Sequence, residues 1–320
     1  MSTRTTPPTL AGRTIRCLLF DLGNTLWTST NSTTWHALQR VANMCAVETL
    51  YAHIPTSERP ATDPLTFGQQ LREAVEQEVY SPSNKLIDIE PDFAQCAVQG
   101  LHTLGFSNVD HELGAAIFEA LRIRIVGSRH VFFDVFATLA ELQRRGFLLG
   151  IVTNRSYGGQ PFLQDLERLG FYRYFDPRSM AISADLGIQK PNPKIFEYAL
   201  DGLHVAAEET AMVGDSLSAD VYGAKQLNMF TVWKPKLHLR PTAQAELMTQ
   251  HITSYTTQES STARDAAAEP YPTLNNAQLL AYVQQHERPR NGYSAHHVQP
   301  DLIIEHIGDL LDTFEKAGKQ

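Results

Sequence analysis

Several polar side chains follow short apolar segments of the sequence, at the points where buried strands are expected to end. Asp21 closes the run IRCLLFD, and Asp215 follows AMVG. Thr153 and Asn154 close the run that begins FLLGIV, and Lys190 lies in GIQKPNP. Two carboxylates suit a divalent cation such as Mg²⁺, whereas a lysine and a hydroxyl suit the oxygens of a small phosphate. One of the carboxylates would be free to attack phosphorus and form an aspartyl-phosphate.

Five short apolar segments would position these residues, and they predict strands over residues 15–21, 147–153, 179–183, 211–214 and 229–233. Each is too short for a helix and is bounded by turn-forming residues. Helical patterns separate the last four segments, over residues 161–170, 192–203 and 218–227. This alternation predicts an α/β fold with a doubly wound parallel sheet, a Rossmann-like core covered on both faces. Ligands bind at the carboxyl ends of such strands, so we expect the polar residues to converge there.

Residues 28–130 show a different pattern, with apolar residues at helical spacing and no convincing strand. Amphipathic helices are predicted over residues 33–51, 67–80, 92–105 and 110–124. We therefore expect an inserted all-α domain over residues 28–130, placed as a cap over a site at the strand ends. The α/β core would then consist of residues 14–27 and 131–320.

The two ends of the chain carry weaker patterns. Residues 1–13 are polar and contain prolines, and we expect a disordered lead-in there. Residues 237–299 predict an insertion or a loop, with short helices over 242–251 and 276–286 on either side of a polar loop at 252–272. Residues 300–318 predict a short strand followed by an amphipathic helix.

Composition narrows the class of protein. The 320 residues are 42% hydrophobic and carry a net charge of −8, and no basic stripe is visible, which argues against nucleic acid and anionic membranes as partners. No apolar run approaches the ~18 residues of a membrane helix, and no signal-peptide pattern is visible, so we expect a cytoplasmic protein. The three cysteines form no CxxC pair, so no zinc site is indicated. We expect a monomer or a homodimer.

Taken together, the motifs resemble those of the haloacid dehalogenase (HAD) superfamily, in order and in spacing. Its first motif is matched by LLFDLGNTL, its second by LLGIVTN, its third by GIQKPNPKIFEYAL and its fourth by MVGDSLSADVYGAKQLNMFTVW. The resemblance covers roughly residues 15–30 and 131–235. It implies a HAD-like hydrolase with a phosphatase-like core, and the helical block at 28–130 resembles the α-helical type-1 cap that selects the substrate.

The resemblance also implies a role for each matching residue. Asp21 matches the nucleophile, which also ligates Mg²⁺, and Lys190 matches the lysine that steadies both the nucleophile and the phosphate. Thr153 matches the phosphate-binding hydroxyl, and Asn154 is placed beside it in the substrate site. Asp215 matches the metal-ligating acid.

Two further residues have supporting positions. Asp220 completes the GDxxxxD pattern, and is either part of the metal's surroundings or a helix cap. Thr25 lies in the first motif, close to the nucleophile.

Gly23 is the departure from the pattern. In the phosphatases of the family this position usually carries a second aspartate, which protonates the leaving oxygen. Such general acid catalysis is worth about 10²–10⁴-fold in rate, and glycine cannot supply it. The resemblance also implies that the backbone carbonyl at this position ligates Mg²⁺. Glycine retains that carbonyl.

Three functional interpretations remain open on the sequence. The favoured one is a Mg²⁺-dependent phosphatase acting on a small phosphorylated metabolite, with a leaving group that needs little protonation or with an acid supplied elsewhere. The second is a dehalogenase-like hydrolase, which needs neither the second aspartate nor a metal, although the intact VGDSLSAD argues against it. The third is a non-catalytic module that binds phosphate or a metabolite.

Overall fold

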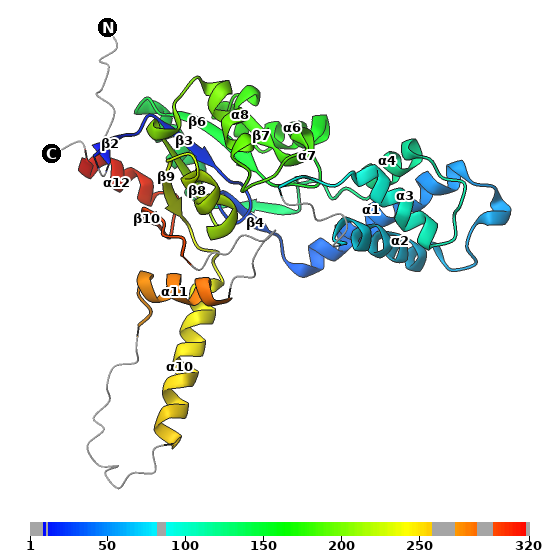
Figure 1. The fold of residues 1–320 in the computed structure, drawn as a ribbon. Coiled ribbons are helices and arrows are strands. Elements are labelled where there is room, and N and C mark those ends of the chain that lie inside the picture. The colour runs from blue at the N-terminus through cyan, green and yellow to red at the C-terminus, as the bar shows by residue number, and fades with distance from the viewer. Residues whose placement is uncertain (1–8, 11, 82–87, 258–272, 287–296, 318–320) are drawn as a thin grey trace.

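A six-stranded parallel sheet forms the centre of the molecule in the computed structural model, which describes residues 9–10, 12–81, 88–257, 273–286 and 297–317 (Figure 1). The strands lie in the order β10-β9-β8-β3-β6-β7, so that the strand that Asp21 follows lies inside the sheet, between β8 and β6. Their bounds are Cys17–Phe20 (β3), Leu148–Thr153 (β6), Met180–Ile182 (β7), Thr210–Gly214 (β8), Phe230–Trp233 (β9) and Leu302–Ile303 (β10). The predicted strands are confirmed to within two residues at each end.

Helices cover both faces of this sheet. One face packs against α5 (Val135–Arg144), α6 (Gly159–Arg168) and α12 (Asp309–Ala317), through a core that includes Leu18 and Phe20. The other face packs against α8 (Pro193–Leu203) and α9 (Tyr222–Lys225), through a core that includes Cys17 and Leu19. All four residues of β3 are buried, because their side chains alternate between two covered faces. The doubly wound α/β fold is therefore confirmed.

A block of four helices lies to one side of the sheet in Figure 1. Its members are α1 (Ser32–His53), α2 (Pro64–Val79), α3 (Phe93–Thr103) and α4 (His111–Ala120). Each helix begins after an Asn or Asp whose side chain accepts a hydrogen bond from a backbone N–H of the first turn, which is a favourable N-cap. The block has a hydrophobic core of its own, centred on residues such as Leu50, Leu71 and Leu101.

A two-stranded ribbon joins the helical block to the sheet. β4 (Trp27–Ser29) pairs antiparallel with β5 (Arg129–Val131), with Thr28 opposite His130. The sequence interpretation placed no strand in this region. Two strands of three residues are too short to give a clear alternating pattern, and only their pairing across about 100 residues of sequence defines them.

The segment after β9 contains more helix than expected. Helix α10 runs over Leu239–Thr257, so the loop expected from residue 252 is wrong for residues 252–257, and residues 258–272 lie outside the described part of the chain. Helix α11 (Asn276–His286) follows, and its Leu279 and Val283 pack with Trp233. Residues 237–299 therefore include two helices, and the α10–α11 pair stands apart from the helical block (Figure 1).

At the N-terminus, Thr9–Leu10 pairs with Arg13–Thr14, so the expected disorder is wrong for those residues. Residues 1–8 and 11 lie outside the described part. The remaining short elements are α7 (Ser183–Leu186), a π-helical turn at Leu217–Val221, and 3₁₀ turns at Thr56–Glu58, Phe171–Arg173, Pro177–Ser179 and Ala207–Glu209. Within the described ranges, none of the helices has the length and hydrophobicity needed to span a lipid bilayer.

Candidate active site

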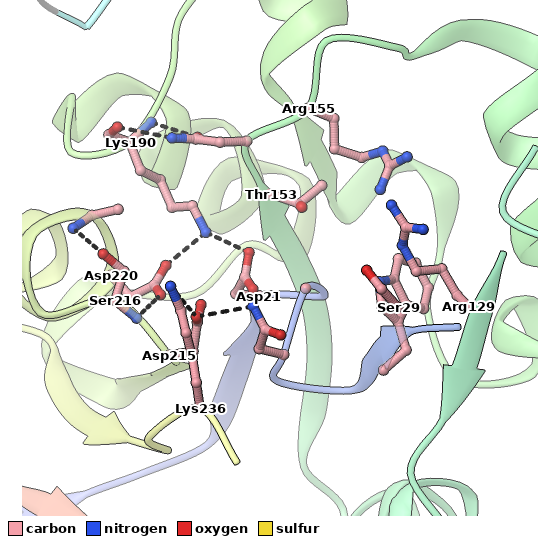
Figure 2. A pocket seen from close by; sticks show the side chains of 15 residues that line it. Asp21, Ser29, Arg129, Thr153, Arg155, Lys190, Asp215, Ser216, Asp220 and Lys236 are labelled. Carbon is pink, nitrogen blue, oxygen red and sulfur yellow. Dashed lines mark hydrogen bonds and ion pairs between the residues drawn. The ribbon is translucent and has the colours of Figure 1, made fainter. Parts of the chain in front are cut away.

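A cavity of about 280 Å³ lies at the carboxyl ends of β3, β6 and β8. Its lining includes the residues that the sequence expected to converge, namely Asp21, Thr153, Asn154, Lys190 and Asp215 (Figure 2). Gly23 and Asp220, which the family resemblance added, line it as well. Thr25 lies behind this lining, fully buried. The topology explains the convergence, because parallel strands with adjacent carboxyl ends place their following loops at one edge of the sheet.

Asp21 follows the central strand directly. Its backbone N–H donates to the carbonyl of Val213 at 2.9 Å, which continues the pairing between β3 and β8 by one residue. Its carboxylate accepts a hydrogen bond from Lys190 Nζ at 2.8 Å on Oδ1 and from Thr25 Oγ1 at 3.3 Å on Oδ2. The side chain is thus held by one contact on each oxygen, while its residue remains 7% exposed at the cavity wall.

Lys190 joins the carboxylates of the site. Its ammonium donates to Asp21 Oδ1 at 2.8 Å, to Asp220 Oδ1 at 2.6 Å and to the carbonyl of Val152 at 2.7 Å. Burial would lower the pKa of Lys190, but the charges of Asp21 and Asp220 outweigh burial and raise that pKa above its ordinary value. The lysine is therefore cationic, and all three of its N–H donors are engaged. A ligand that contacts Nζ must take the place of one of these acceptors.

Asn154 orients this lysine. Its side-chain amide donates to the backbone carbonyl of Lys190 at 2.9 Å and accepts from the backbone N–H of Lys190 at 2.8 Å. The sequence interpretation placed Asn154 in the substrate site, and it does line the cavity. Its amide is nevertheless used to fix the loop that carries Lys190. Thr153, buried at the end of β6, also lines the cavity.

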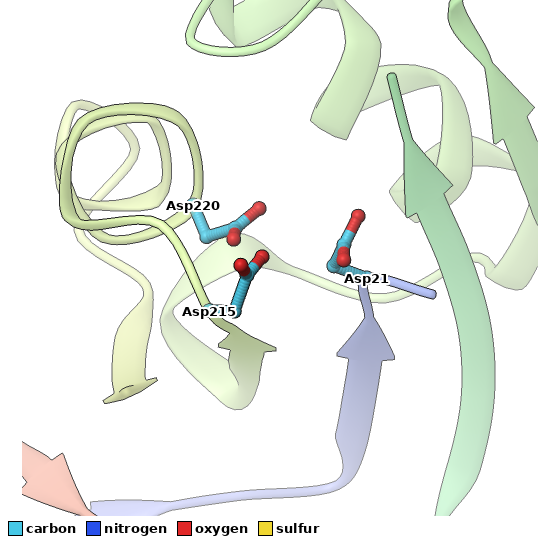
Figure 3. A group of neighbouring side chains, drawn as sticks. All are labelled: Asp21, Asp215 and Asp220. Carbon is cyan, nitrogen blue, oxygen red and sulfur yellow. The ribbon is translucent and has the colours of Figure 1, made fainter. Parts of the chain in front are cut away.

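Asp215 and Asp220 complete a group of three carboxylates. One oxygen from each of Asp21, Asp215 and Asp220 can be chosen so that all three lie within 4.8 Å of one another (Figure 3). Burial and the charges of Asp21 and Asp220 together raise the pKa of Asp215 to about 7. Lys236 Nζ lies 3.6 Å from Asp215 Oδ2 and partly offsets this crowding.

The group has the properties of a site for a hard divalent cation. All of its donors are carboxylate oxygens, which is the chemistry that Mg²⁺ prefers. Burial raises the pKa of Asp215 most, and the nearby charges of Asp21 and Asp220 raise it further, so a bound cation would stabilise the ionised carboxylate. The residues present therefore fit Mg²⁺.

Asp220 is held from two sides. Its Oδ1 accepts from Lys190 Nζ, and its Oδ2 accepts from the backbone N–H of Ser216 at 2.9 Å. The N-cap residue is Ser216, whose Oγ accepts from the N–H of Ala219 at 3.1 Å, and Asp220 accepts the backbone N–H of this same residue. Asp220 therefore contributes to the start of the helix as well as to the group of carboxylates. Asp220 packs against Gly214 so closely that a Cβ on that glycine would lie 2.2 Å from the Asp220 carboxylate.

Gly23 has different surroundings. A Cβ built on this residue meets nothing within 4 Å, because it would point into open space beside the cavity. The following turn is fixed by Lys234, which is buried and donates from Nζ to the carbonyl of Asn24 at 3.0 Å. The position that lacks the usual aspartate thus has room for a larger side chain.

Two arginines that the sequence interpretation did not single out line the cavity. Arg155 follows β6 by two residues, and Arg129 belongs to β5 in the ribbon. Burial lowers the pKa of both, and for Arg155 the neighbouring charge of Arg129 adds to this and the pKa falls to about 10. The rule that sites form at strand ends could have found Arg155, whereas Arg129 required knowledge of the β4–β5 pairing.

A second cavity of about 290 Å³ adjoins the first. It shares Arg129, Asn154 and Arg155 with the first cavity. The rest of its wall comes mainly from α1, α2, α4 and the loop after β6, and includes Trp35, Glu76, Val79, Phe118 and Tyr157. The helical block therefore contributes directly to a space that continues from the carboxylates of the sheet.

Comparisons with known proteins agree with this architecture. A family model described as "haloacid dehalogenase-like hydrolase" matches residues 15–228. A glyceraldehyde 3-phosphate phosphatase of Pyrococcus furiosus is 42% identical over 98 residues, which is 30% of this chain and 38% of that protein. A phosphoserine phosphatase of Thermus thermophilus is 41% identical over 105 residues, which is 33% of this chain and 40% of that protein.

The matches thus span about two fifths of the length of these curated relatives. Among solved structures, a 2-haloacid dehalogenase from Pseudomonas syringae pv. Tomato covers 94% of this chain, and 99% of its own chain is matched. The TM-score is 0.51 and the sequence identity 20%, so this likeness concerns the fold alone. The family model covers well over half of the sequence, and the chain accordingly belongs to the haloacid dehalogenase-like hydrolases.

Proposed function

We propose that the protein is a Mg²⁺-dependent phosphatase that acts on a small phosphorylated metabolite, with Asp21 as the nucleophile. The observation that carries this proposal is the geometry around Asp21, whose carboxylate contacts the ammonium of Lys190 and belongs to the group of three carboxylates. The names of the curated relatives support it, because those relatives are phosphatases of small phosphorylated compounds. The α-helical block would act as the cap, since it walls the adjoining cavity.

In this proposal the carboxylate of Asp21 attacks phosphorus, forming an O–P bond while the bond to the leaving oxygen breaks. Water then attacks the aspartyl-phosphate, which releases inorganic phosphate and restores the carboxylate of Asp21. Lys190 orients the carboxylate of Asp21 through its hydrogen bond, and can exchange one of its acceptors for a phosphate oxygen. Thr153 at the end of β6 would donate its hydroxyl to the same phosphate. Asp21, Asp215 and the carbonyl of Gly23 would hold Mg²⁺, with Asp220 in support. The cation would supply charge neutralisation for the phosphate oxygens.

The leaving oxygen has no acid at position 23, because glycine has no side chain. The proton must come from solvent or from another group, and this favours leaving groups of low basicity, such as acyl, aryl or sugar-1-phosphates. The proposed substrate is therefore a phosphate ester or anhydride whose leaving group departs with little protonation.

The test is phosphate release from a panel of phosphomonoesters, with and without Mg²⁺, by the unaltered protein and by Asp21→Asn. We expect Mg²⁺-dependent release that falls by about 10⁴-fold or more in the variant, because the nucleophile is lost. Arg144→Gln is the matched control, since this side chain is 73% exposed on α5 and is not part of the cavity lining. Halide release from 2-haloacids that ignores Mg²⁺ would overturn the proposal. The proposal would also be overturned if neither phosphate nor halide were released while Mg²⁺ stabilised the fold, because that result would indicate a binding module.

A further inference from the structure

Arg129 and Arg155 form a concentration of positive charge on the side of the cavity away from Lys190. Figure 2 shows their guanidinium groups pointing toward one another, to one side of Thr153 and Asp21. Arg155 extends from the loop after β6, and Arg129 from the ribbon that leads into the helical block. Two like charges in a partly buried site repel each other, and an anion bound between them would offset that repulsion.

Neither arginine forms an ion pair with a carboxylate among the residues that the structure describes. Arg129 donates to the carbonyl of Ser128 at 2.8 Å and stacks on the ring of Trp35. Arg155 makes a long contact of 3.5 Å to the carbonyl of Tyr157 and stacks on the ring of Phe162. These contacts fix the two side chains, and none of them joins a guanidinium to a carboxylate in the described part of the chain.

The other arginines around the two cavities differ in this respect. Each is paired with a carboxylate: Arg72 with Glu76, Arg122 with Glu119 and Arg124 with Asp165. The lack of a carboxylate is therefore particular to the two arginines that line the cavity of the candidate active site, and it is not a general property of this region.

We propose that Arg129 and Arg155 bind a second anionic group of the substrate, a carboxylate or a second phosphate, while the reacting phosphate lies at Asp21. This inference rests on the proposed phosphatase function. Both arginines line the first cavity together with Asp21, and both also line the second cavity. A substrate whose phosphate lies at Asp21 and whose leaving group extends into the second cavity would therefore lie beside them. Guanidinium groups suit carboxylates and phosphates, with which they form paired N–H···O hydrogen bonds.

The proposal has a measurable consequence for affinity. A hydrogen-bonded contact to a charged group is worth enough to change binding by about tenfold or more. A ligand with two anionic groups should therefore bind more tightly than a ligand of equal length with one. Replacing either arginine by glutamine should remove most of that preference, because the remaining guanidinium alone holds the second group less firmly.

Binding of non-hydrolysable phosphonates, measured by calorimetry in the presence of Mg²⁺, tests this consequence without relying on turnover. The ligands with a carboxylate are phosphonoacetate, 3-phosphonopropionate and 4-phosphonobutyrate, and each is compared with the alkylphosphonate of equal length. Propane-1,3-bisphosphonate represents a second phosphate. The proteins are the unaltered chain, Arg129→Gln, Arg155→Gln, Arg155→Lys and the exposed control Arg144→Gln, each checked by thermal melting.

We expect at least one two-anion ligand to bind about tenfold or more tightly than its one-anion partner. The preference should fall about tenfold in each Gln variant, recover in part in Arg155→Lys and stay unchanged in Arg144→Gln. The series that shows the preference then identifies the second group as carboxylate or phosphate. Equal affinities within every pair, or a preference that survives both Gln variants, would overturn the subsite. Phosphate release that continues under that result would leave the proposed function standing. A preference for two-anion ligands without hydrolysis of any phosphomonoester would overturn the proposed phosphatase function and would still support the anion subsite.

Discussion

Two walls of the same cavity differ in whether their charged side chains form ion pairs within the protein. The paired wall, formed by Asp21, Lys190, Asp215 and Asp220, is built by loops of the α/β core. Its lysine makes hydrogen bonds of 2.8 and 2.6 Å to two carboxylates. The cationic wall, formed by Arg129 and Arg155, has no carboxylate partner among the described residues. In the paired wall a lysine is hydrogen-bonded to two of the three carboxylates, whereas no carboxylate among the described residues forms an ion pair with either arginine of the cationic wall.

The difference shows which parts of the site are fixed before a ligand arrives. A buried ion pair that loses one partner leaves an uncompensated charge, so the paired wall is tied to the stability of the fold. The cationic wall keeps some contact with solvent and stacks on aromatic rings, so its charges are tolerated without a partner. We therefore expect substitutions in the first wall to affect folding and reaction, and substitutions in the second to affect ligand preference.

The strongest test of this difference compares Lys190→Met with Arg155→Gln. Lys190→Met leaves Asp21 and Asp220 buried without their shared cation, and we expect it to lower the free energy of unfolding by about 3–5 kcal/mol. Arg155→Gln removes a charge that forms no ion pair with the described carboxylates, and its effect on the free energy of unfolding should stay within about 1 kcal/mol. Urea denaturation of both variants measures the two free energies.

Equal losses in the two variants would show that the walls do not differ in the way proposed. Phosphate release provides a second measurement for Lys190→Met, assayed at a temperature at which the variant is folded. We expect it to fall about 10³-fold or more, because charge stabilisation beside the nucleophile is lost. Arg144→Gln controls for the removal of a positive charge elsewhere.

The open space beside Gly23 allows a carboxylate to be added next to the paired wall. Because a Cβ at this position meets nothing within 4 Å, Gly23→Asp fits sterically and restores a carboxyl group next to the nucleophile. We expect the variant to hydrolyse alkyl phosphates, which have basic leaving groups, up to about 10²-fold faster than the unaltered protein. Aryl phosphates should gain much less, since their leaving groups need little protonation. Steady-state kinetics on the two classes measures the ratio, and an equal change in both would argue that position 23 supplies no acid.

Two glycines near the paired wall differ in how closely they are packed: Gly214 lies against Asp220, and Gly23 faces open space. Gly214→Ala would force a Cβ into the side chain of Asp220, and we expect a loss of about 1–3 kcal/mol in the free energy of unfolding from overpacking. Gly23→Ala is the matched control, because its Cβ enters open space and its φ is not positive, so the change should stay within about 0.5 kcal/mol. Thermal or urea denaturation distinguishes the two. A tolerated Gly214→Ala would mean that Asp220 can move away from Lys190.

The sequence predicted the sheet well because each of its strands is a continuous apolar run, and the polar residues after those runs were correctly expected at one edge. The same reasoning missed the cationic wall. Arg129 is placed by the pairing of Trp27–Ser29 with Arg129–Val131, and contacts between short segments so far apart have no local pattern. Asn154 lines the cavity as the sequence predicted, but its hydrogen bonds to the Lys190 loop could not be predicted, because residue type and position alone do not tell which group a side chain faces.

The extent of α10 was underestimated for a related reason. Residues 252–257, ITSYTT, are rich in β-branched and hydroxyl side chains, which have low helix propensity, yet they continue the helix that begins at Leu239. Propensity is a weak guide once a helix has been started, since propagation costs less than nucleation. The helices of residues 28–130, by contrast, carry both amphipathic spacing and capping residues, and they were found.

The smallest effect concerns the balance of charge within the paired wall in the absence of a metal. Burial, with the charges of Asp21 and Asp220, raises the pKa of Asp215 to about 7 in the folded protein, against an ordinary value of 3.8. Between about pH 4 and pH 7 the folded protein therefore holds a proton that the unfolded chain has lost. The free energy of unfolding must then fall as the pH rises through this window.

Asp215→Asn removes this titration. In EDTA we expect the variant to show a smaller fall in unfolding free energy between pH 4 and pH 7, and a gain of about 1 kcal/mol over the unaltered protein at pH 8. The gain stays modest because asparagine gives up the attraction to Lys236 at 3.6 Å and brings amide hydrogens that need acceptors. Urea denaturation at each pH measures both proteins. Adding Mg²⁺ should reverse the order, because a cation bound by Asp215 stabilises the folded protein that retains the carboxylate. Parallel pH profiles without metal would show that the three carboxylates do not crowd one another, and the paired wall would then be balanced without a cation.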